Sequence, residues 1–148
     1  METKRVMIED RNHIKDEELG RQPVYCVQGA WWHFPRRPYT VWAAMPWTRM
    51  RQGKFTPQKE GPRYNPLIAH VSCMEEVAPL VKEIPEAGRK LMEAFWPGPL
   101  TMIFPKSEKV PYGTTGGLDT VAIRMPDDPV ANRLIALAGV PVAAPSAN

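Results

Sequence analysis

The sequence predicts an α/β fold, in which helices pack on a twisted, open, mixed β-sheet. Two observations support this prediction. Short apolar runs of strand length alternate with amphipathic segments of helix length over residues 65–148, and Pro or Gly residues separate them. The length of 148 residues is typical of one domain, so we expect a single domain over residues 1–148.

The first expected elements are a strand at residues 5–8 (RVMI) and a helix beginning near Asp16, with acidic residues in its first turn. Residues 66–71 (PLIAHV) are predicted to form a buried strand. A helix is expected over residues 74–84, because apolar residues recur there at helical intervals.

A second helix is expected over residues 86–95, with Leu91, Met92 and Phe95 on its apolar side. It should end at residues 96–99 (WPGP), because proline cannot continue a helix.

The last third of the chain completes the alternation. Strands are expected at residues 100–104 (LTMIF) and 120–124 (TVAIR). A helix over residues 129–137 should end at Gly139, a residue that favours helix C-caps. Residues 140–144 are predicted to form the last strand.

Composition narrows the function classes only slightly. The net charge of +3 is compatible with an anionic ligand or RNA, although a charge of this size often serves solubility alone. Cys26 and Cys73 show no metal-binding or redox spacing, so we expect reduced thiols and a cytoplasmic protein. No apolar run approaches the ~20 residues that span a bilayer, and the charged N-terminus lacks the apolar core of a signal peptide.

Residues 21–64 differ from the rest of the chain. They contain no Leu, Ile, Asp, Asn or Ser, but hold four of the five tryptophans and eight of the nineteen Lys and Arg residues. The segment is compatible with a nucleic-acid-binding arm whose rings stack on bases, with a disordered insert, or with a sequence that was never selected as protein. We therefore expect the N-terminal portion of the fold to be disrupted.

Four motifs in the C-terminal part resemble, in order and spacing, the YrdC-like family of threonylcarbamoyl-AMP synthases. They are RYNPLIAHV, FWPGPLTMIF, TTGGLDTVAIRMPDDPVA and AGVPVAAPSAN. The resemblance implies a twisted α/β fold with a positively charged concave site. It also implies that L-threonine, bicarbonate and ATP, with Mg²⁺, are converted to threonylcarbamoyl-AMP and pyrophosphate. The product would feed the modification of adenosine 37 in tRNAs that read ANN codons, through the downstream tRNA threonylcarbamoyl transferase machinery.

The resemblance also implies two groups of site residues. Arg124, a bidentate donor at the end of TVAIR, and His70 are expected to contact L-threonine, with Ala144 contributing only its backbone. Without the resemblance, Arg124 would form a surface ion pair with Asp127 or Asp128, and His70 would be an ordinary core histidine. The expected ATP contacts are Lys59, Asn65, Thr120, Ser146 and Asn148.

A shifted reading frame accounts for residues 21–64. Permitted codons for WHFPRRPYTVW, read two bases later, spell AFPTETVYGL, which resembles the family's threonine-side motif. The same shift turns GKFTPQKEGPR into a version of the family segment KIYAAKGRPS. We interpret residues 21–64 as a family sequence between two compensating insertions or deletions, in the gene or in its sequencing. Relatives continue for several tens of residues past the position of Asn148, so we also expect a C-terminally truncated copy.

The altered segment replaces part of the expected site. Relatives carry a Lys-x-Arg pair before the Asn65 motif. Lys59 falls on the lysine position, but Gly61 falls on the arginine position, and Arg63 is two places away. Losing one positioned phosphate donor costs about 3–4 kcal/mol of transition-state stabilisation. We therefore expect weak or absent activity.

Two other functions compete with this enzyme. A double-stranded RNA or tRNA-binding module without catalysis fits the basic, Trp-rich residues 21–64. A 3,4-dihydroxy-2-butanone 4-phosphate synthase would need an acidic metal-binding cluster near the N-terminus, and the sequence shows no such cluster, so no protein metal site is expected. The pair Gly116-Gly117 lacks the GxxxxGK spacing of a phosphate loop, and we expect a turn there.

Overall fold

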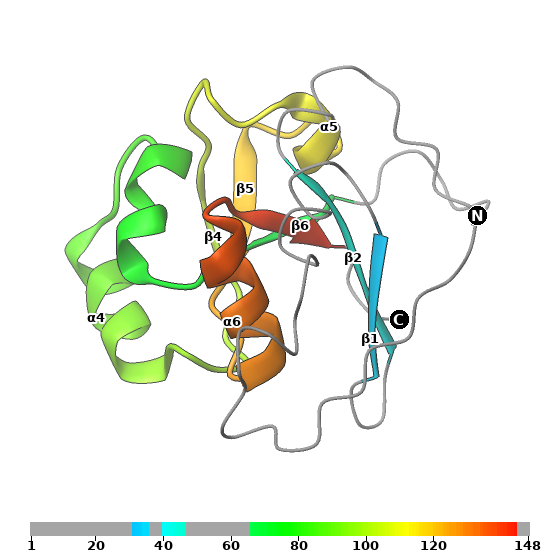
Figure 1. The fold of residues 1–148 in the computed structure, drawn as a ribbon. Helices are drawn as coiled ribbons and strands as arrows, with labels where there is room; N and C mark the ends of the chain where they lie inside the picture. The colour runs from blue at the N-terminus through cyan, green and yellow to red at the C-terminus, as the bar shows by residue number, and fades with distance from the viewer. Residues whose placement is uncertain (1–30, 36–39, 47–65, 145–148) are drawn as a thin grey trace.

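The structure is a computed structural model that describes residues 31–35, 40–46 and 66–144, the first two ranges by their backbone alone. These residues form a six-stranded sheet with the strand order β1-β2-β6-β3-β5-β4 (Figure 1). The strands are β1 (Trp31–Pro35), β2 (Thr40–Pro46), β3 (Ile68–His70), β4 (Met102–Pro105), β5 (Thr120–Arg124) and β6 (Val142–Ala144). The helical elements are η1 (Met74–Glu76), η2 (Ala78–Leu80), α4 (Glu86–Phe95), α5 (Tyr112–Thr115) and α6 (Pro129–Ala138).

One parallel pair of strands lies inside the sheet. β3 and β5 run parallel, and all other neighbouring pairs are antiparallel. The sheet is therefore mixed, and the predicted α/β fold class is confirmed. β1 and β2, which no periodic pattern predicted, form an antiparallel pair at one edge. The strand expected at residues 5–8 and the helix expected from Asp16 lie outside the described residues.

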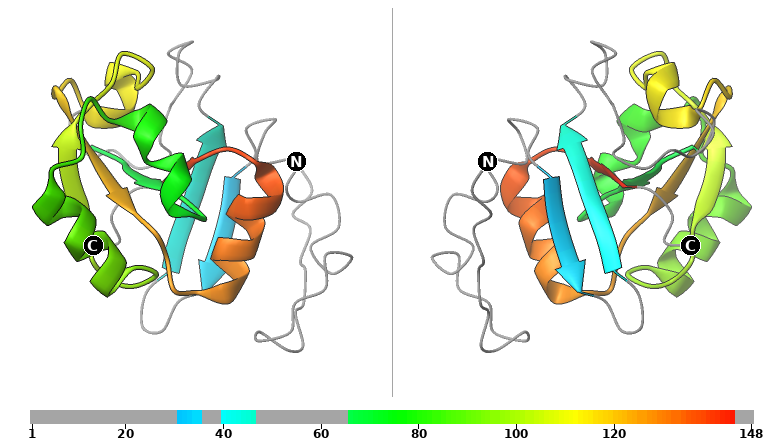
Figure 2. Two further views of the ribbon diagram at one scale, coloured as in Figure 1. Left: turned by 90° about the vertical axis from the view of Figure 1, so that its left-hand side faces the viewer. Right: turned by 90° about the vertical axis from the view of Figure 1, so that its right-hand side faces the viewer.

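Helices α4 and α6 cover the same side of the sheet, as the two side views show (Figure 2). Buried side chains of the sheet pack in one cluster with Met92 of α4, among them Val121 and Ile123 of β5 and Phe104 of β4. The alternate residues of β5 are exposed or half-buried. Because side chains alternate across a strand, β5 has one side in the core and one side half-open.

Helix α4 has the predicted bounds but not the predicted buried side. Its buried residues are Gly88 and Met92, whereas Leu91 and Phe95 are 44% and 55% exposed. A Cβ atom on Gly88 would lie 3.2 Å from the Phe104 ring, so the helix approaches the sheet closely at this glycine. That close approach fixes which side of α4 is buried.

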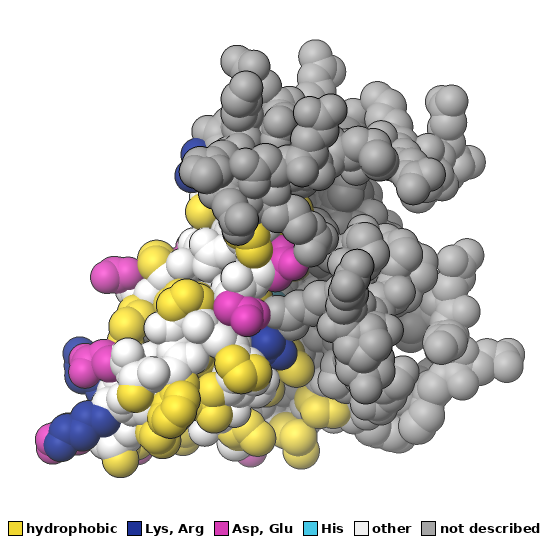
Figure 3. Space-filling model, turned by 90° about the horizontal axis from the view of Figure 1, so that it is seen from below, with side chains coloured by type: hydrophobic (Ala, Val, Ile, Leu, Met, Phe, Trp, Pro, Cys, Tyr) yellow, Lys and Arg dark blue, Asp and Glu magenta, His cyan; other side chains and the backbone are white. Residues whose placement is uncertain are grey.

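Hydrophobic side chains form much of the described surface seen from below (Figure 3).

The continuous helix predicted over residues 74–84 is wrong. The chain forms two short 3₁₀ turns there, η1 and η2. Pro79 lies inside the segment, where it has no N–H to donate and its ring clashes with the preceding turn of an α-helix. Ser107 holds η2 in place, donating from its Oγ to the Pro79 carbonyl at 2.7 Å and from its backbone N to the Leu80 carbonyl at 2.8 Å.

The strand predicted over residues 66–71 is shorter and less buried than expected. β3 covers only three residues, and Ile68 and His70 are half-buried while Ala69 is fully buried. The predicted strand is therefore present but buried on one side only, because Ile68 and His70 lie on the same half-open side as the alternate residues of β5.

The remaining elements agree with the sequence after small shifts. α6 begins after Asp128, whose carboxylate accepts from the backbone N–H groups of Val130 and Ala131 at 3.0 Å, and it ends at Gly139 with φ of 63°. β5 has the predicted bounds, while β4 and β6 begin later than predicted. The predicted turn at Gly116-Gly117 is confirmed, since both residues have positive φ. Helix α5 just before it was not predicted.

Candidate functional site

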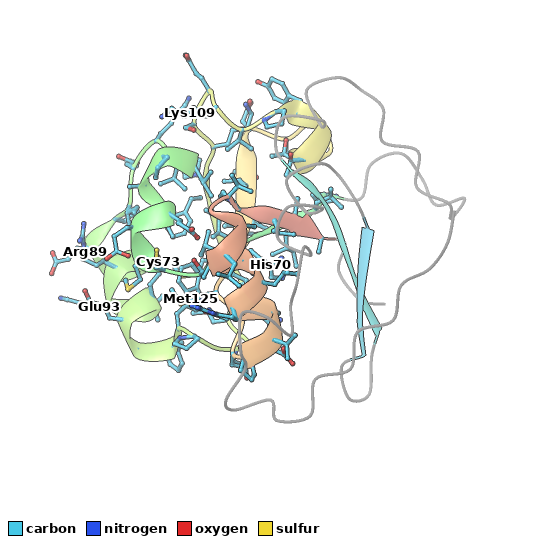
Figure 4. The ribbon with its side chains drawn as sticks, in the orientation of Figure 1. His70, Cys73, Arg89, Glu93, Lys109 and Met125 are labelled. Carbon is cyan, nitrogen blue, oxygen red and sulfur yellow. The ribbon has the colours of Figure 1, made fainter. Side chains whose placement is uncertain are left out.

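The site is built at the carboxyl ends of the two parallel strands. His70 is the last residue of β3 and Arg124 the last residue of β5, and the two residues are direct partners in the parallel register. Neighbouring strands lie about 4.8 Å apart, and partners in register point to the same side of a sheet. His70 and Arg124 therefore leave the sheet side by side; Figure 4 labels His70. In open α/β sheets, the carboxyl ends of strands are the usual place for ligands.

The other two described site candidates lie on the same side of the sheet. Thr120 precedes Arg124 by four residues on β5, so both point to the same side. Ile68 precedes His70 by two residues, and its partner on β6 is Ala144. We call the side that carries His70, Thr120 and Arg124 the open face. Ala144 belongs to it by register but is itself buried, since β6 is buried on both sides.

Arg124 is held by the loop that follows α4. Its Nε–H donates to the Gly98 carbonyl at 3.0 Å, and its Nη2 lies 3.9 Å from a carboxylate oxygen of Asp127. The ion pair that the sequence offered as an alternative role is thus present with Asp127, at a length where exposed pairs contribute about 0–1 kcal/mol. The carboxylate of Asp128 caps α6 instead. The side chain of Arg124 is only 18% exposed, so it is not a freely solvated surface arginine.

The hydrogen bond of His70 defines its tautomer. Nδ1 lies 3.1 Å from the carbonyl oxygen of Ile68. Because a carbonyl only accepts, Nδ1 carries the proton, and in the neutral ring Nε2 is then an acceptor. This tautomer suits a ligand that donates an N–H or O–H.

The loops behind the two strand ends are tied together. Asn132 of α6 donates from Nδ2 to the carbonyls of Ser72 and Pro126 at 3.4 and 3.5 Å, which joins the loop after β3 to the loop after β5. Glu76 accepts from the backbone N–H of Ser72 at 2.7 Å and from its Oγ at 3.2 Å. Sequence reasoning missed Asn132 and Gly98, and no local pattern marks either residue as part of a site.

A second polar cluster lies at the other end of β5, next to Thr120. The buried Nζ of Lys106 donates to the Val110 carbonyl at 3.1 Å and lies 3.8 Å from the centroid of the Tyr112 ring. The Tyr112 hydroxyl donates to Asp119 at 2.8 Å, and this hydrogen bond to a carboxylate raises the pKa of Tyr112. The cluster fixes the turn from which Thr120 starts the strand.

Four predicted site residues fall outside the described ranges, namely Lys59, Asn65, Ser146 and Asn148. Among the residues that the structure describes, no group of three or more His, Cys, Asp or Glu side chains could hold a metal ion. No helix in the same residues is long and apolar enough to cross a membrane.

Comparisons with known proteins identify the family of the chain. The profile of the Sua5/yciO/yrdC family, described as "Telomere recombination", matches residues 49–148. The threonylcarbamoyl-AMP synthase of Pyrococcus abyssi is 56% identical over 90 residues, which are 61% of this chain and 26% of that protein. The protein of the same name from Bacillus subtilis is 47% identical over 96 residues, covering 64% of this chain and 28% of that protein. The chain thus spans only about a quarter of the length of these relatives.

Solved structures of the same family also have a fold similar to that of this chain. P. abyssi Sua5 complexed with L-threonine matches with a TM-score of 0.77 and 39% identity, over 90% of this chain and 39% of that one. Escherichia coli YciO matches with a TM-score of 0.69 over 90% of this chain and 65% of that one, but at 17% identity it supports the fold alone. Residues 49–64 of the unusual segment lie within the profile match, and the shifted reading frame stays a hypothesis. The chain belongs to the Sua5/YciO/YrdC family.

Proposed function

We propose that the chain is a threonylcarbamoyl-AMP synthase domain, which joins L-threonine, bicarbonate and ATP and releases pyrophosphate. The observation that carries this proposal is the adjacent placement of His70 and Arg124 at the ends of two parallel strands. Two likenesses support it. A relative with this name is 56% identical over 90 residues, and a similar structure was solved with L-threonine.

The threonine subsite is proposed at this pair. Arg124 suits the carboxylate of L-threonine, because a guanidinium donates two parallel hydrogen bonds to a carboxylate. The acceptor Nε2 of His70 suits an N–H or O–H donor of the same ligand. Ala144 contributes its backbone only.

The ATP subsite is proposed at the opposite end of the open face. Arg124 lies four residues after Thr120 along β5, a distance of about 13 Å, which leaves room for threonine and a phosphate group next to each other. The family resemblance adds Lys59, Asn65, Ser146 and Asn148 as further ATP contacts. The described residues offer no acidic cluster for Mg²⁺. We expect Mg²⁺ to enter with the ATP phosphates, since it usually binds through substrate phosphates and water.

The proposed reaction proceeds in two balanced steps. The amine of L-threonine attacks the carbon of bicarbonate, and water leaves, which gives N-carboxythreonine. A carbamate oxygen then attacks the α-phosphorus of ATP, the bond to the β-phosphate oxygen breaks, and pyrophosphate leaves. The protein contributes mainly positioning and charge stabilisation.

Turnover by this chain is proposed to be weak. Gly61 stands where relatives carry a cationic phosphate donor, and removing one such donor costs about 3–4 kcal/mol of transition-state stabilisation. A single domain, a cytoplasmic location and tRNA-modifying partners remain parts of the proposal. The RNA-binding alternative depends on residues 21–64, whose side chains lie outside the described part of the chain.

The test is L-threonine binding by the 148-residue chain, measured by calorimetry, with pyrophosphate release followed in parallel. Arg124→Ala should weaken L-threonine binding about 10- to 100-fold, because a charged hydrogen-bonded pair is lost. The matched control is Arg89→Ala, which removes an exposed arginine from α4, far from His70 in Figure 4. The proposal fails if both variants bind L-threonine as the unmodified chain does, or if the unmodified chain does not bind it.

A further inference from the structure

We propose that Gly98 is a positioning residue for Arg124, and that the loop of residues 96–99 sets the affinity of the site for a ligand carboxylate. The inference rests on the proposed function, because it takes L-threonine as the ligand of Arg124. It assigns a role to the WPGP segment beyond ending helix α4.

Gly98 is joined to the end of β5 by two hydrogen bonds in opposite directions. Its backbone N–H donates to the Met125 carbonyl at 2.9 Å, and its carbonyl accepts from Nε–H of Arg124 at 3.0 Å. The hydrogen bond to the Met125 carbonyl holds the loop against the strand. The hydrogen bond from Arg124 then holds the guanidinium at the position of the Gly98 carbonyl. Because the guanidinium is planar, anchoring Nε orients the edge formed by its two terminal nitrogens, which is the edge that grips a carboxylate end-on.

The loop itself is rigidly connected to the core. Trp96 is buried, its indole Nε1–H donates to the Leu100 carbonyl at 2.7 Å, and its backbone N–H donates to the Met92 carbonyl at 2.9 Å. The Gly98 carbonyl therefore has a fixed position relative to both α4 and β5.

Only glycine fits at position 98. A Cβ atom there would lie 2.3 Å from the carbonyl oxygen of Phe95, which is backbone and cannot rotate away. Any side chain must displace the loop, and with it the carbonyl that holds Arg124. Asp127 cannot replace this anchor, since its carboxylate lies 3.9 Å from Nη2, beyond the roughly 2.7–2.9 Å of a charge-assisted hydrogen bond.

Gly98→Ala is the first test, read by calorimetry with L-threonine and with ATP. We expect the Kd for L-threonine to rise about 10-fold or more, since hydrogen bonds to charged groups are worth roughly this factor, while the Kd for ATP stays within about twofold. Gly139→Ala is the control. It strains a left-handed residue at the end of α6, but its Cβ meets nothing within 4 Å, so it should lower stability without changing the Kd for L-threonine.

A double-mutant cycle separates positioning from general damage. If Gly98 acts through Arg124, Gly98→Ala should have no further effect on L-threonine binding in an Arg124→Ala background. Equal weakening in both backgrounds would overturn the inference. So would unchanged binding in Gly98→Ala when Arg124→Ala binds poorly, an outcome that leaves the proposed function intact. Unchanged binding in Arg124→Ala overturns the proposed function and this inference together.

A second variant serves if Gly98→Ala does not fold. Trp96→Phe keeps an aromatic ring in the core and removes the indole N–H that holds Leu100. The readout is the Nε–H resonance of Arg124 in the NMR spectrum of the ligand-free chain. It should exchange slowly with water in the unmodified chain and faster in Trp96→Phe; fast exchange in the unmodified chain would contradict the proposed anchor.

Discussion

At the scale of single residues, the site depends on what surrounds two ordinary side chains. His70 and Arg124 are the last residues of their strands, and each is fixed by a backbone carbonyl, that of Ile68 for His70 and that of Gly98 for Arg124. The hydrogen bonds to these carbonyls determine the tautomer of the imidazole and the orientation of the guanidinium. The residue type alone specifies neither property, so the chemistry of both side chains depends on neighbouring backbone groups.

Cys73 is predicted to react slowly with alkylating reagents. Burial, followed by a hydrogen bond with Glu75, raises the pKa of the Cys73 thiol, so the folded state favours the protonated form. The resulting stabilisation is complete below the pKa of the unfolded thiol and is lost as pH rises through the higher folded pKa. In a Cys26→Ser variant at pH 8, iodoacetamide should modify Cys73 more slowly in the folded chain than in the chain unfolded by urea. A faster rate in the folded chain would contradict the raised pKa.

At the scale of elements, capping residues determine where the helices begin and end, and close contacts determine which side of a helix is buried. α6 is bounded by a carboxylate cap at Asp128 and a left-handed Gly139. α4 is bounded by Pro85 before its first residue and the WPGP loop after its last. Both boundaries follow from residues that the local sequence displays, whereas the buried side of α4 follows from its contact with Phe104.

Removing the cap of α6 should destabilise the fold. Asp128→Ala leaves the N–H groups of Val130 and Ala131 without their carboxylate acceptor, and losing such a cap costs about 1 kcal/mol. The matched variant Asp128→Asn keeps a side-chain oxygen that can accept these hydrogen bonds, so it should change the free energy of unfolding by at most about 0.5 kcal/mol. Urea denaturation of the two variants measures the difference, and equal effects would show that Asp128 does not act as a cap.

Helix α4 offers a similar comparison between its two sides. Met92→Ala empties a buried position and should cost about 2–5 kcal/mol of unfolding free energy. Leu91→Ala truncates a side chain that is 44% exposed, and it should cost less than about 1 kcal/mol. Chemical denaturation measures the unfolding free energy of both variants. A larger decrease for Leu91→Ala than for Met92→Ala would contradict the buried position of Met92 in the structure.

At the scale of the whole molecule, much of the core and the candidate site lie on different sides of the sheet. α4 and α6 cover one side (Figure 2), and the core cluster that joins Met92 of α4 to Val121 and Ile123 of β5 lies on that side. The open face on the other side carries His70, Thr120 and Arg124, which can therefore serve a ligand without being needed to fill the core.

Ligand binding on the open face should stabilise the whole fold. A ligand at 100 times its Kd adds about 2.7 kcal/mol to the stability of a folded protein, which for a domain of this size corresponds to a Tm increase of about 5–10 °C. We expect L-threonine and ATP each to raise the Tm, whereas D-threonine at equal concentration should not. An unchanged Tm with saturating L-threonine would contradict a folded threonine subsite.

The fold could be predicted from the sequence wherever local chemistry marks an element. The bounds of α4 and β5 and both ends of α6 were predicted, because capping residues, prolines and glycines stand at them. The helix over residues 74–84 failed because its apolar spacing was helical while Pro79 excluded a continuous helix. Of the candidate site, the sequence offered His70, Thr120, Arg124 and Ala144 only through resemblance, since no local pattern distinguishes them from core or surface residues.

By itself, the sequence determined the family, the α/β class and the order of most elements after residue 65, because these depend on motifs and periodicities within short stretches. Only the tertiary structure decided which residues meet. The register of β3 on β5 makes His70 and Arg124 neighbours, and packing of the α4 loop brings Gly98 to an arginine 26 residues further along the chain. Pairing register and close approach are properties of the packed sheet as a whole, so no short segment of the sequence specifies them.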